Sequence, residues 1–281
     1  MRTIATLPGP PRWRGRARAS EGADIGIRAR AMLTKLRKAA DIAAASWRAT
    51  AEGLRSAPPT YVDIGARGGL PRPWALAHRL GLIRPVMFEP DAQAADEIRT
   101  RNPGIEVAPY ALGAEDGKAE TLRVTVAPGQ SSILLPDKAN PFLNSSWDVA
   151  KEIALTLRRF DAVWDGNWGR PDFVKIDVQG YEVEVIKGMG DRLEEALCVE
   201  LESSFIPFYR GQPVFQDVHD FMRLKGFDLV KLRPIGLYRG SVVVEFNAFF
   251  VRAERHEDPR ARFWKAVNDV GKERRIWALG Y

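Results

Sequence analysis

From residue 60 onward, short apolar runs alternate with longer stretches in which apolar residues recur every three or four positions. The apolar runs cover residues 62–64, 85–88, 105–110, 173–176 and 197–201. The stretches with helical periodicity cover residues 74–80, 92–101 and 214–225. Short apolar runs between turn residues predict buried strands, and the periodic stretches predict helices. This alternation indicates an α/β fold with an open, mostly parallel sheet and helices on both faces.

Two further regions belong to the predicted domain: a pair of strands that completes the sheet, and an insertion between its third and fourth strands. Residues 229–232 and 242–251 predict a closing pair of strands. Between the third and fourth strands, residues 120–126 and 131–135 flank a Pro-Gly pair, which predicts a hairpin, and residues 144–155 predict a helix. A long insertion at the carboxyl edge of such a sheet usually shapes the substrate pocket.

The pattern divides the chain into three parts. Residues 1–57 form a basic extension: residues 1–20 lack apolar periodicity, and an amphipathic helix is predicted over 24–53. Residues 58–254 form the main domain, and residues 255–281 form a helical tail with periodicity over 263–278. The basic helix could dock on a membrane surface or a partner. Its alanine-rich stripe favours packing on the domain or on a second copy, which would make a homo-oligomer.

Charge and composition narrow the class of protein. The chain carries a net charge of +6, but residues 1–57 alone carry +8 and the remainder −2, so no nucleic-acid groove is expected in the main domain. No apolar run approaches the ~18 residues that a membrane span requires. Cys198 is the single cysteine, and the first residues lack the apolar stretch of a secretory signal, so we expect a cytoplasmic protein without disulfides.

The motif with the most chemical content follows the first predicted strand. Asp63 stands two residues before Gly65, Gly69 follows, and Glu89 ends the second apolar run. A dinucleotide fingerprint needs glycines at relative positions one, three and six, and a Walker loop needs a Gly-Lys-Ser/Thr end, and both are absent. An acid beside the turn favours an ammonium group over a diphosphate, and Glu89 can accept hydrogen bonds from a ribose. S-adenosylmethionine has both groups.

Six short motifs, taken in order, resemble the FkbM family of S-adenosylmethionine-dependent methyltransferases. They are Val-Asp-Ile-Gly-Ala-x-x-Gly, Phe-Glu-Pro, Ala-Leu-Gly, Ser-Ser-x-Leu, Lys-Ile-Asp-Val-Gln-Gly-x-Glu and Glu-x7-Tyr-x-Gly-Gln followed by Gly-Phe-x-Leu, and they span residues 61–252. The chain departs from the family at Arg67, where Asn is frequent, and over residues 157–163.

The resemblance implies a Rossmann-like class I methyltransferase with seven strands, the last of them antiparallel. The cofactor site that it implies consists of Asp63, Gly65, Ala66, Gly69, Glu89, Pro90, Ala111 and Leu112. Ala111 and Leu112 would line the adenine. Tyr209 and Gln212 match the Tyr-x-Gly-Gln segment and are expected beside the pocket.

Methyl transfer to oxygen requires that the acceptor hydroxyl lie close to the methyl group and lose its proton. Asp177 ends the fourth predicted strand, Glu182 begins the next helix and Glu202 ends the fifth strand, so these three acids are the candidate bases. Together they could also bind a divalent cation through oxygen ligands. Alternatively, some of them only cap helices or pair with Lys175, Lys187 or Arg210.

The expected function is an S-adenosylmethionine-dependent O-methyltransferase that acts on a hydroxyl of a small molecule, sugar or glycan. One alternative is an N-methyltransferase acting on nucleic acid or protein, although Asp-Val-Gln-Gly-Tyr stands where nucleic-acid amino methyltransferases carry Asp-Pro-Pro-Tyr. A second alternative is a non-catalytic cofactor-binding module that uses the basic arm for interactions.

Overall fold

The computed structural model describes residues 48, 50–235 and 242–269. The chain divides into two units, Met1–Thr50 and Ala51–Tyr281, and every element named below belongs to the second. Residues 48 and 50–56 are helical, but residues 24–47 and 49 of the helix predicted over 24–53 lie outside the described residues. The part of the predicted C-terminal helix beyond residue 269 also lies outside them.

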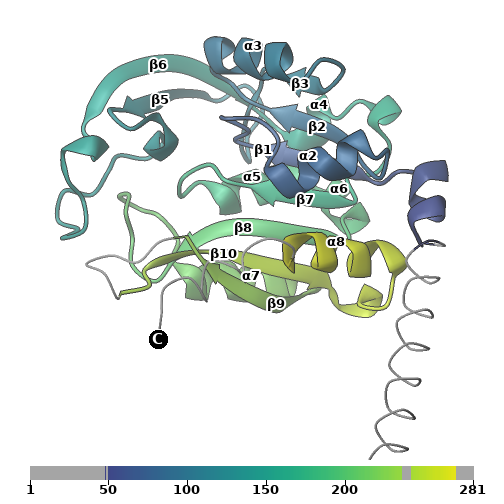
Figure 1. Ribbon diagram of the computed structural model, residues 1–281. Helices are drawn as coiled ribbons and strands as arrows, with labels where there is room; N and C mark the ends of the chain where they lie inside the picture. The colour runs from purple at the N-terminus through teal and green to yellow at the C-terminus, as the bar shows by residue number, and fades with distance from the viewer. Residues whose placement is uncertain (1–47, 49, 236–241, 270–281) are drawn as a thin grey trace, which may run out of the picture. The chain divides into compact units, whose positions relative to one another are not determined.

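A seven-stranded sheet forms the centre of the second unit (Figure 1). Its strands, in spatial order, are β3 (Glu106–Ala108), β2 (Arg84–Phe88), β1 (Thr60–Ile64), β7 (Phe173–Ile176), β8 (Cys198–Ser204), β10 (Glu245–Arg252) and β9 (Phe227–Pro234). The first five pair in parallel, and β10 runs antiparallel to both of its neighbours. The predicted α/β fold with one antiparallel strand is therefore confirmed.

Helices pack on both faces of this sheet because successive strand residues point to opposite sides. On one face, Tyr61 and Phe173 pack with α2 (Arg72–Arg79) and α8 (Pro259–Asp269). On the other face, strand residues such as Val62 and Val174 pack with four helices. These are α4 (Phe160–Val163), α5 (Glu182–Met189), α6 (Arg192–Glu195) and α7 (Phe215–Leu224). The helix α3 (Ala92–Arg101) packs on Met87 and Val107.

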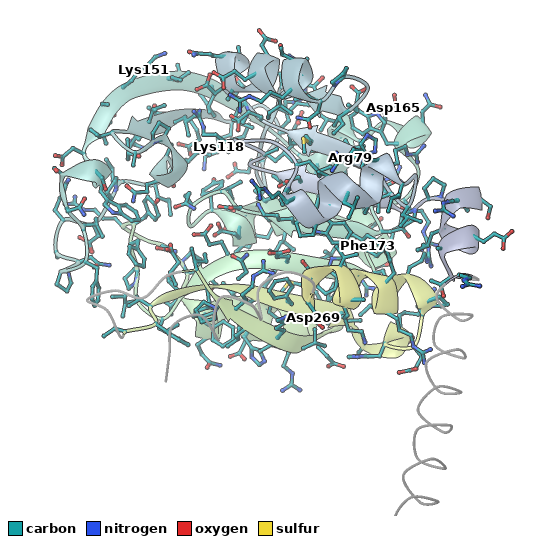
Figure 2. All side chains as sticks on the ribbon, viewed as in Figure 1. Arg79, Lys118, Lys151, Asp165, Phe173 and Asp269 are labelled. Atoms are coloured by element: carbon teal, nitrogen blue, oxygen red, sulfur yellow. The ribbon has the colours of Figure 1, made fainter. Side chains whose placement is uncertain are left out.

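Figure 2 shows how side chains fill the layers between the sheet and these helices. Phe173 is fully buried at the sheet, whereas Arg79 and Lys151 lie on the surface. No helix in the described ranges is both long enough and apolar enough to cross a membrane.

A second, three-stranded sheet contradicts two predictions for the insertion. It consists of β4 (Ala111–Leu112), β6 (Val149–Arg158) and β5 (Ala119–Thr125), in that order. The long antiparallel partner of β5 is β6. The segment 131–135 contributes only an isolated bridge between Arg123 and Ser132, and the Pro-Gly pair forms the 3-10 turn η1 (Pro128–Gln130). The predicted hairpin is therefore wrong.

The predicted helix over residues 144–155 is also wrong beyond its first turn. A 3-10 turn, η2 (Ser145–Trp147), leads directly into β6. Ile153, Leu155 and Leu157 recur at every second position, which is the period of a strand. Alanine, glutamate and leucine have high helix propensity, but here pairing with β5 outweighs that local preference.

Candidate functional site

The carboxyl ends of three parallel strands are joined by backbone hydrogen bonds at one edge of the large sheet. The amides of Gly65 and Ala66 both donate to the carbonyl of Phe88, at 3.0 and 3.1 Å. The amide of Asp177 donates to the carbonyl of Ile64, at 2.9 Å. Gly65 has a φ of 79°, and an added Cβ would lie 2.0 Å from the carbonyl oxygen of Asp177. Only glycine fits there, so the turn after β1 lies directly against the end of β7.

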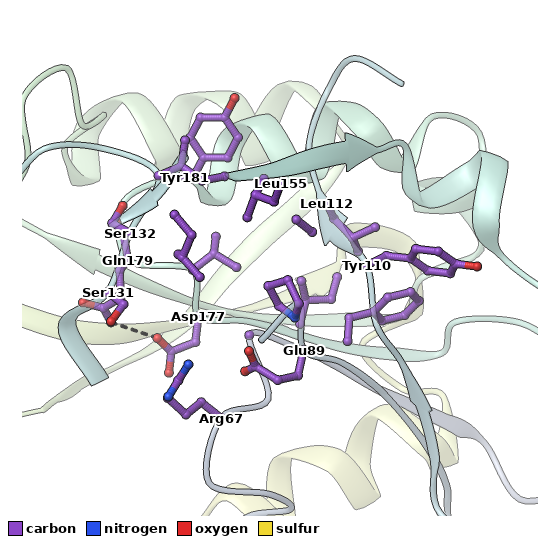
Figure 3. Close-up of a pocket in the computed structure, with 18 of the residues that line it drawn as sticks. Arg67, Glu89, Tyr110, Leu112, Ser131, Ser132, Leu155, Asp177, Gln179 and Tyr181 are labelled. Carbon is purple, nitrogen blue, oxygen red and sulfur yellow. Dashed lines mark hydrogen bonds between the residues drawn. The ribbon is translucent and has the colours of Figure 1, made fainter. Parts of the chain in front are cut away.

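A cavity with about 870 Å³ of empty space, part of it open to solvent, lies at this edge. Its lining includes Gly65, Arg67, Glu89, Pro90, Tyr110, Ala111, Leu112, Leu122, Pro128, Gly129, Ser131, Ser132, Leu155, Asp177, Val178, Gln179 and Tyr181. In Figure 3, Glu89 and Asp177 enter from the strand ends, and Leu112, Leu155 and Tyr181 lie opposite them. One side of the cavity therefore carries two acids together with the guanidinium of Arg67, and the other side is apolar.

The predicted cofactor residues divide into two groups by position. Five of them line the cavity: Gly65, Glu89, Pro90, Ala111 and Leu112. Asp63, Ala66 and Gly69 do not line it. Ala66 is buried against α3, and Gly69 closes the turn by donating its amide to the carbonyl of Ala66 at 2.9 Å. The role of each residue toward a cofactor stays a prediction.

Glu89 follows β2 and is 3% exposed. Its Oε1 accepts the amide of Asp91 at 2.9 Å. Burial raises the pKa of Glu89, while the amide of Asp91 and the guanidinium of Arg67 oppose this rise. Arg67 itself is held by Asp91, with Nη2 to Oδ2 at 2.6 Å. Glu89 therefore keeps an oxygen, Oε2, to which the structure assigns no hydrogen bond within the described ranges.

A row of buried charges crosses the sheet beneath the cavity. Asp63 on β1, Lys175 on β7 and Glu200 on β8 occupy adjacent register positions. Nζ of Lys175 lies 3.3 Å from Asp63 and 3.2 Å from Asp177. Burial alone would lower the pKa of Lys175, but Asp177, Asp63 and Glu200 outweigh it and raise this pKa. Burial raises the pKa of Asp63 and Lys175 opposes it, and the Asp63 carboxylate accepts a hydrogen bond from Nζ of Lys175.

Asp177 is the one member of the three predicted bases that lines the cavity. Burial raises its pKa, but Lys175, Glu202 and Gln179 outweigh burial and hold the pKa well below the usual range. Nε2 of Gln179 donates to Oδ1 of Asp177 at 3.0 Å. Asp177 is therefore an ionised carboxylate at neutral pH.

The other two predicted bases lie behind the cavity wall. Glu202 lies inside β8, two residues before its end, and its Oε2 accepts Nε2 of Gln179 at 3.0 Å, the same nitrogen that donates to Asp177. Burial, Asp177 and Glu245 raise the pKa of Glu202 well above its usual range. Glu182 is 4% exposed, and its Oε1 accepts the amides of Val178 and Gly180 at 3.2 and 3.0 Å. Glu182 thus fixes the turn after Asp177, and in the described residues it neither caps α5 nor pairs with a lysine or arginine.

Several cavity residues were absent from the sequence-based site. Ser131 and Ser132 belong to a motif that carried the family resemblance, so a signal for them existed. Arg67 was noticed only as a departure from the family. Gln179 belongs to the Lys-Ile-Asp-Val-Gln-Gly-x-Glu motif, but the motif alone does not show the left-handed backbone that directs its side chain. Tyr209 and Gln212 lie beside the pocket wall: the Tyr209 hydroxyl donates to Oε1 of Gln179 at 2.8 Å, and Oε1 of Gln212 accepts two amides.

No group of three or more His, Cys, Asp or Glu side chains in the described part of the chain is arranged to hold a metal ion. The carboxylates at the strand ends are instead engaged with Lys175 and Gln179.

Comparison with protein-family models matches residues 63–229 to the methyltransferase FkbM domain. Comparison with curated proteins finds no match. Among solved structures, the chain is similar to magnesium protoporphyrin IX methyltransferase from Synechocystis PCC 6803 with bound SAM, at 11% identity and a TM-score of 0.36, over 74% of this chain and 80% of that one. It is also similar to LepI in complex with SAM, at 11% identity and a TM-score of 0.34, over 70% of this chain and 44% of that one.

The buried position of Glu182 predicts a pH-dependent stability. Burial raises its pKa from 4.5 to about 7, so the folded state binds a proton more tightly than the unfolded chain. The stabilisation is complete below the unfolded pKa and is lost as pH rises through the folded value. Between about pH 4.5 and about pH 7.5, the free energy of unfolding of the wild type should fall by on the order of 3 kcal/mol relative to Glu182→Gln.

Denaturant unfolding across this pH range measures the difference. Glu184→Gln, on the same helix but partly exposed, is the matched control and should follow the wild type. Parallel curves for the wild type and Glu182→Gln would contradict the buried, proton-binding role.

Proposed function

The chain belongs to the FkbM family of S-adenosylmethionine-dependent methyltransferases, and from this membership we propose that it methylates a hydroxyl group of a small molecule, sugar or glycan. The observation that carries the proposal is the pairing of Glu89 and Asp177 on one side of the same cavity. Glu89 can accept a hydrogen bond from a ribose hydroxyl, and Asp177 can accept the proton of an acceptor hydroxyl. A free, buried thiol at Cys198 is consistent with the proposed cytoplasmic location.

The cavity offers suitable groups for each part of S-adenosylmethionine. Tyr110, Ala111 and Leu112 supply apolar surface and backbone for an adenine. The available Oε2 of Glu89 can accept a hydrogen bond from a ribose hydroxyl. Gly65 allows the backbone to approach the methionine part closely. When bound, the cofactor supplies an electrophilic methyl group on a positively charged sulfur.

Asp177 is the proposed acceptor of the hydroxyl proton. Bound S-adenosylmethionine would supply the methyl group to the acceptor oxygen, and the leaving sulfur would keep the electron pair of the broken carbon–sulfur bond. The proton on that oxygen would then be far more acidic than a carboxylic acid. A carboxylate with a low pKa, such as Asp177, can therefore accept it. Each transfer removes one negative charge from Asp177 and one positive charge from sulfur, so the net charge of the site is unchanged.

Glu182 and Glu202 are poorer candidates for direct contact with the acceptor. Neither lines the cavity, and both have a raised pKa because they are buried. We propose that they act through Asp177, Glu182 by fixing the turn that follows it and Glu202 by donating a hydrogen bond to it. Assembly into a homo-oligomer through the N-terminal helix stays a prediction for residues outside the described ranges.

The cofactor assignment predicts tight binding of S-adenosylhomocysteine and none of NAD. Glu89→Gln removes the charge that accepts the ribose hydroxyl and should weaken binding by roughly 10- to 100-fold, because hydrogen bonds to charged groups contribute about 1.5–3 kcal/mol. Isothermal titration calorimetry measures the binding of S-adenosylhomocysteine and of NAD to the wild type and to Glu89→Gln. Glu106→Gln, at the exposed start of β3, is the control and should bind like the wild type. Equal affinities of Glu89→Gln and the wild type would contradict the ribose contact.

The assignment of Asp177 predicts a loss of turnover without a loss of cofactor. Asp177→Asn should lower kcat by about 100-fold or more, as for removal of a general base, while the affinity for S-adenosylhomocysteine stays close to that of the wild type. The assay follows S-adenosylhomocysteine release with a panel of hydroxylated small molecules and sugars. Asp96→Asn, exposed on α3, is the control.

Full turnover of Asp177→Asn with an acceptor that the wild type methylates would sink the role of Asp177. Parallel assays with magnesium and with a chelator separate a carboxylate base from a metal-assisted reaction.

A further inference from the structure

Gln179 has a backbone conformation that stands out at the cavity wall. Its φ is 56°, the one positive value of a non-glycine residue in the described ranges. Side chains disfavour this left-handed region, and such strain persists only where the surroundings impose it. The side chain also lines the cavity, three residues from the end of β7.

Contacts on both sides impose this conformation. The hydroxyl of Ser132, from the inserted segment, donates to the backbone carbonyl of Gln179 at 2.7 Å. On the other side, Glu182 accepts the amide of Gly180 at 3.0 Å. Gly180 is itself crowded, since an added Cβ would lie 3.1 Å from both Tyr209 and Gln212. The turn is thus fixed by three separate segments of the chain.

The strained backbone directs the Gln179 side chain at two carboxyl groups. Its Nε2 donates to Oδ1 of Asp177 and to Oε2 of Glu202, both at 3.0 Å. The Tyr209 hydroxyl lies 2.8 Å from Oε1 of Gln179 and also 2.8 Å from the carbonyl oxygen of Gln130, so the two carboxyl acceptors of Nε2 determine the orientation of the amide. An amide nitrogen has two hydrogens, so both bonds form together. One side chain therefore joins the end of β7 to β8.

We propose that Gln179 is a positioning residue that holds Asp177 and Glu202 as a hydrogen-bonded carboxyl pair sharing one proton, with the ionised oxygen of Asp177 presented to the cavity. The catalytic role of this pair rests on the proposed function. The carboxyl pair of Asp177 and Glu202 can nevertheless be observed without any methyl acceptor.

The surrounding charges favour one proton on the pair. Lys175 on β7 favours the ionised form of Asp177. Burial, Asp177 and Glu245 on β10 oppose ionisation of Glu202 and raise its pKa, so Glu202 is the member of the proposed pair that keeps the proton. Asp63 on β1, Glu182 on α5 and Tyr209 also face this group.

Removal of the Gln179 amide should raise the pKa of Asp177 for two reasons that act in the same direction. Asp177 loses the hydrogen bond from Gln179, and it loses part of the hydrogen bond from Glu202 once the pair is free to separate. Both bonds stabilise the ionised form. A role limited to stabilising the fold would leave this titration unchanged.

The test is infrared spectroscopy of the full-length protein saturated with S-adenosylhomocysteine, as a function of pH. Wild type minus Glu202→Gln isolates the protonated carboxyl group of Glu202, and wild type minus Asp177→Asn isolates Asp177. We expect a protonated Glu202 at neutral pH. We expect Asp177 to titrate at least about one pH unit higher in Gln179→Gly than in the parent protein.

Melting temperatures provide the structural control. Glycine relieves the left-handed strain but also removes the side-chain hydrogen bonds, so a cooperative melting transition of Gln179→Gly is the sign that this variant folds. Gln179→Met, which keeps the length of the side chain without a donor, should reproduce the titration shift if the glycine variant fails to fold. Gln216→Ala, exposed on α7, should leave the titration unchanged.

Two results would overturn the inference: an ionised Glu202 at neutral pH in the wild type, or the same Asp177 titration with and without the Gln179 amide. Neither result depends on methyl transfer. Failure of the proposed function, seen as full turnover of Asp177→Asn, is thus separate from failure of the carboxyl pair.

Discussion

A single buried cation, Lys175, is the interaction on which the site depends. Its ammonium group lies between Asp63 on β1 and Asp177 at the end of β7, and Glu200 stands beside it on β8. Buried carboxylates are costly unless they are paired and hydrogen-bonded. Without Lys175, Asp63 and Asp177 would lack a cationic partner in the middle of the sheet, whereas Glu200 would keep Arg233 at 2.6 Å. The lysine therefore makes it possible for the strand ends to carry an ionised Asp177 at the cavity.

The same sheet edge gives its two cavity acids different properties. Burial raises the pKa of Glu89. Only Oε1 of Glu89 accepts a backbone amide in the described residues, so Oε2 is available to a ligand. Asp177 is surrounded by donors and held ionised. Both follow parallel strands, so the topology brings them to one cavity while their neighbours determine their chemistry. This division supports a cofactor contact at the first acid and proton transfer at the second.

Local sequence patterns predicted the parts of the fold that depend on local signals. The apolar runs of β1, β2 and β7, with Gly65 and the acids that follow them, were recognisable because turn and strand preferences agree with the final fold. The strand β6 was mistaken for a helix because its partner, β5, lies far back in the sequence. Gln179 was missed because its left-handed backbone arises from tertiary contacts with Ser132 and with the segment around Tyr209.

The most direct test of the central claim is a crystal structure of the full-length protein with S-adenosylhomocysteine. The account predicts the ribose hydroxyls on Glu89, the adenine beside residues 110–112, and the sulfur facing Asp177 across the cavity. A ligand bound elsewhere, or one whose ribose leaves Glu89 without contact, would contradict it.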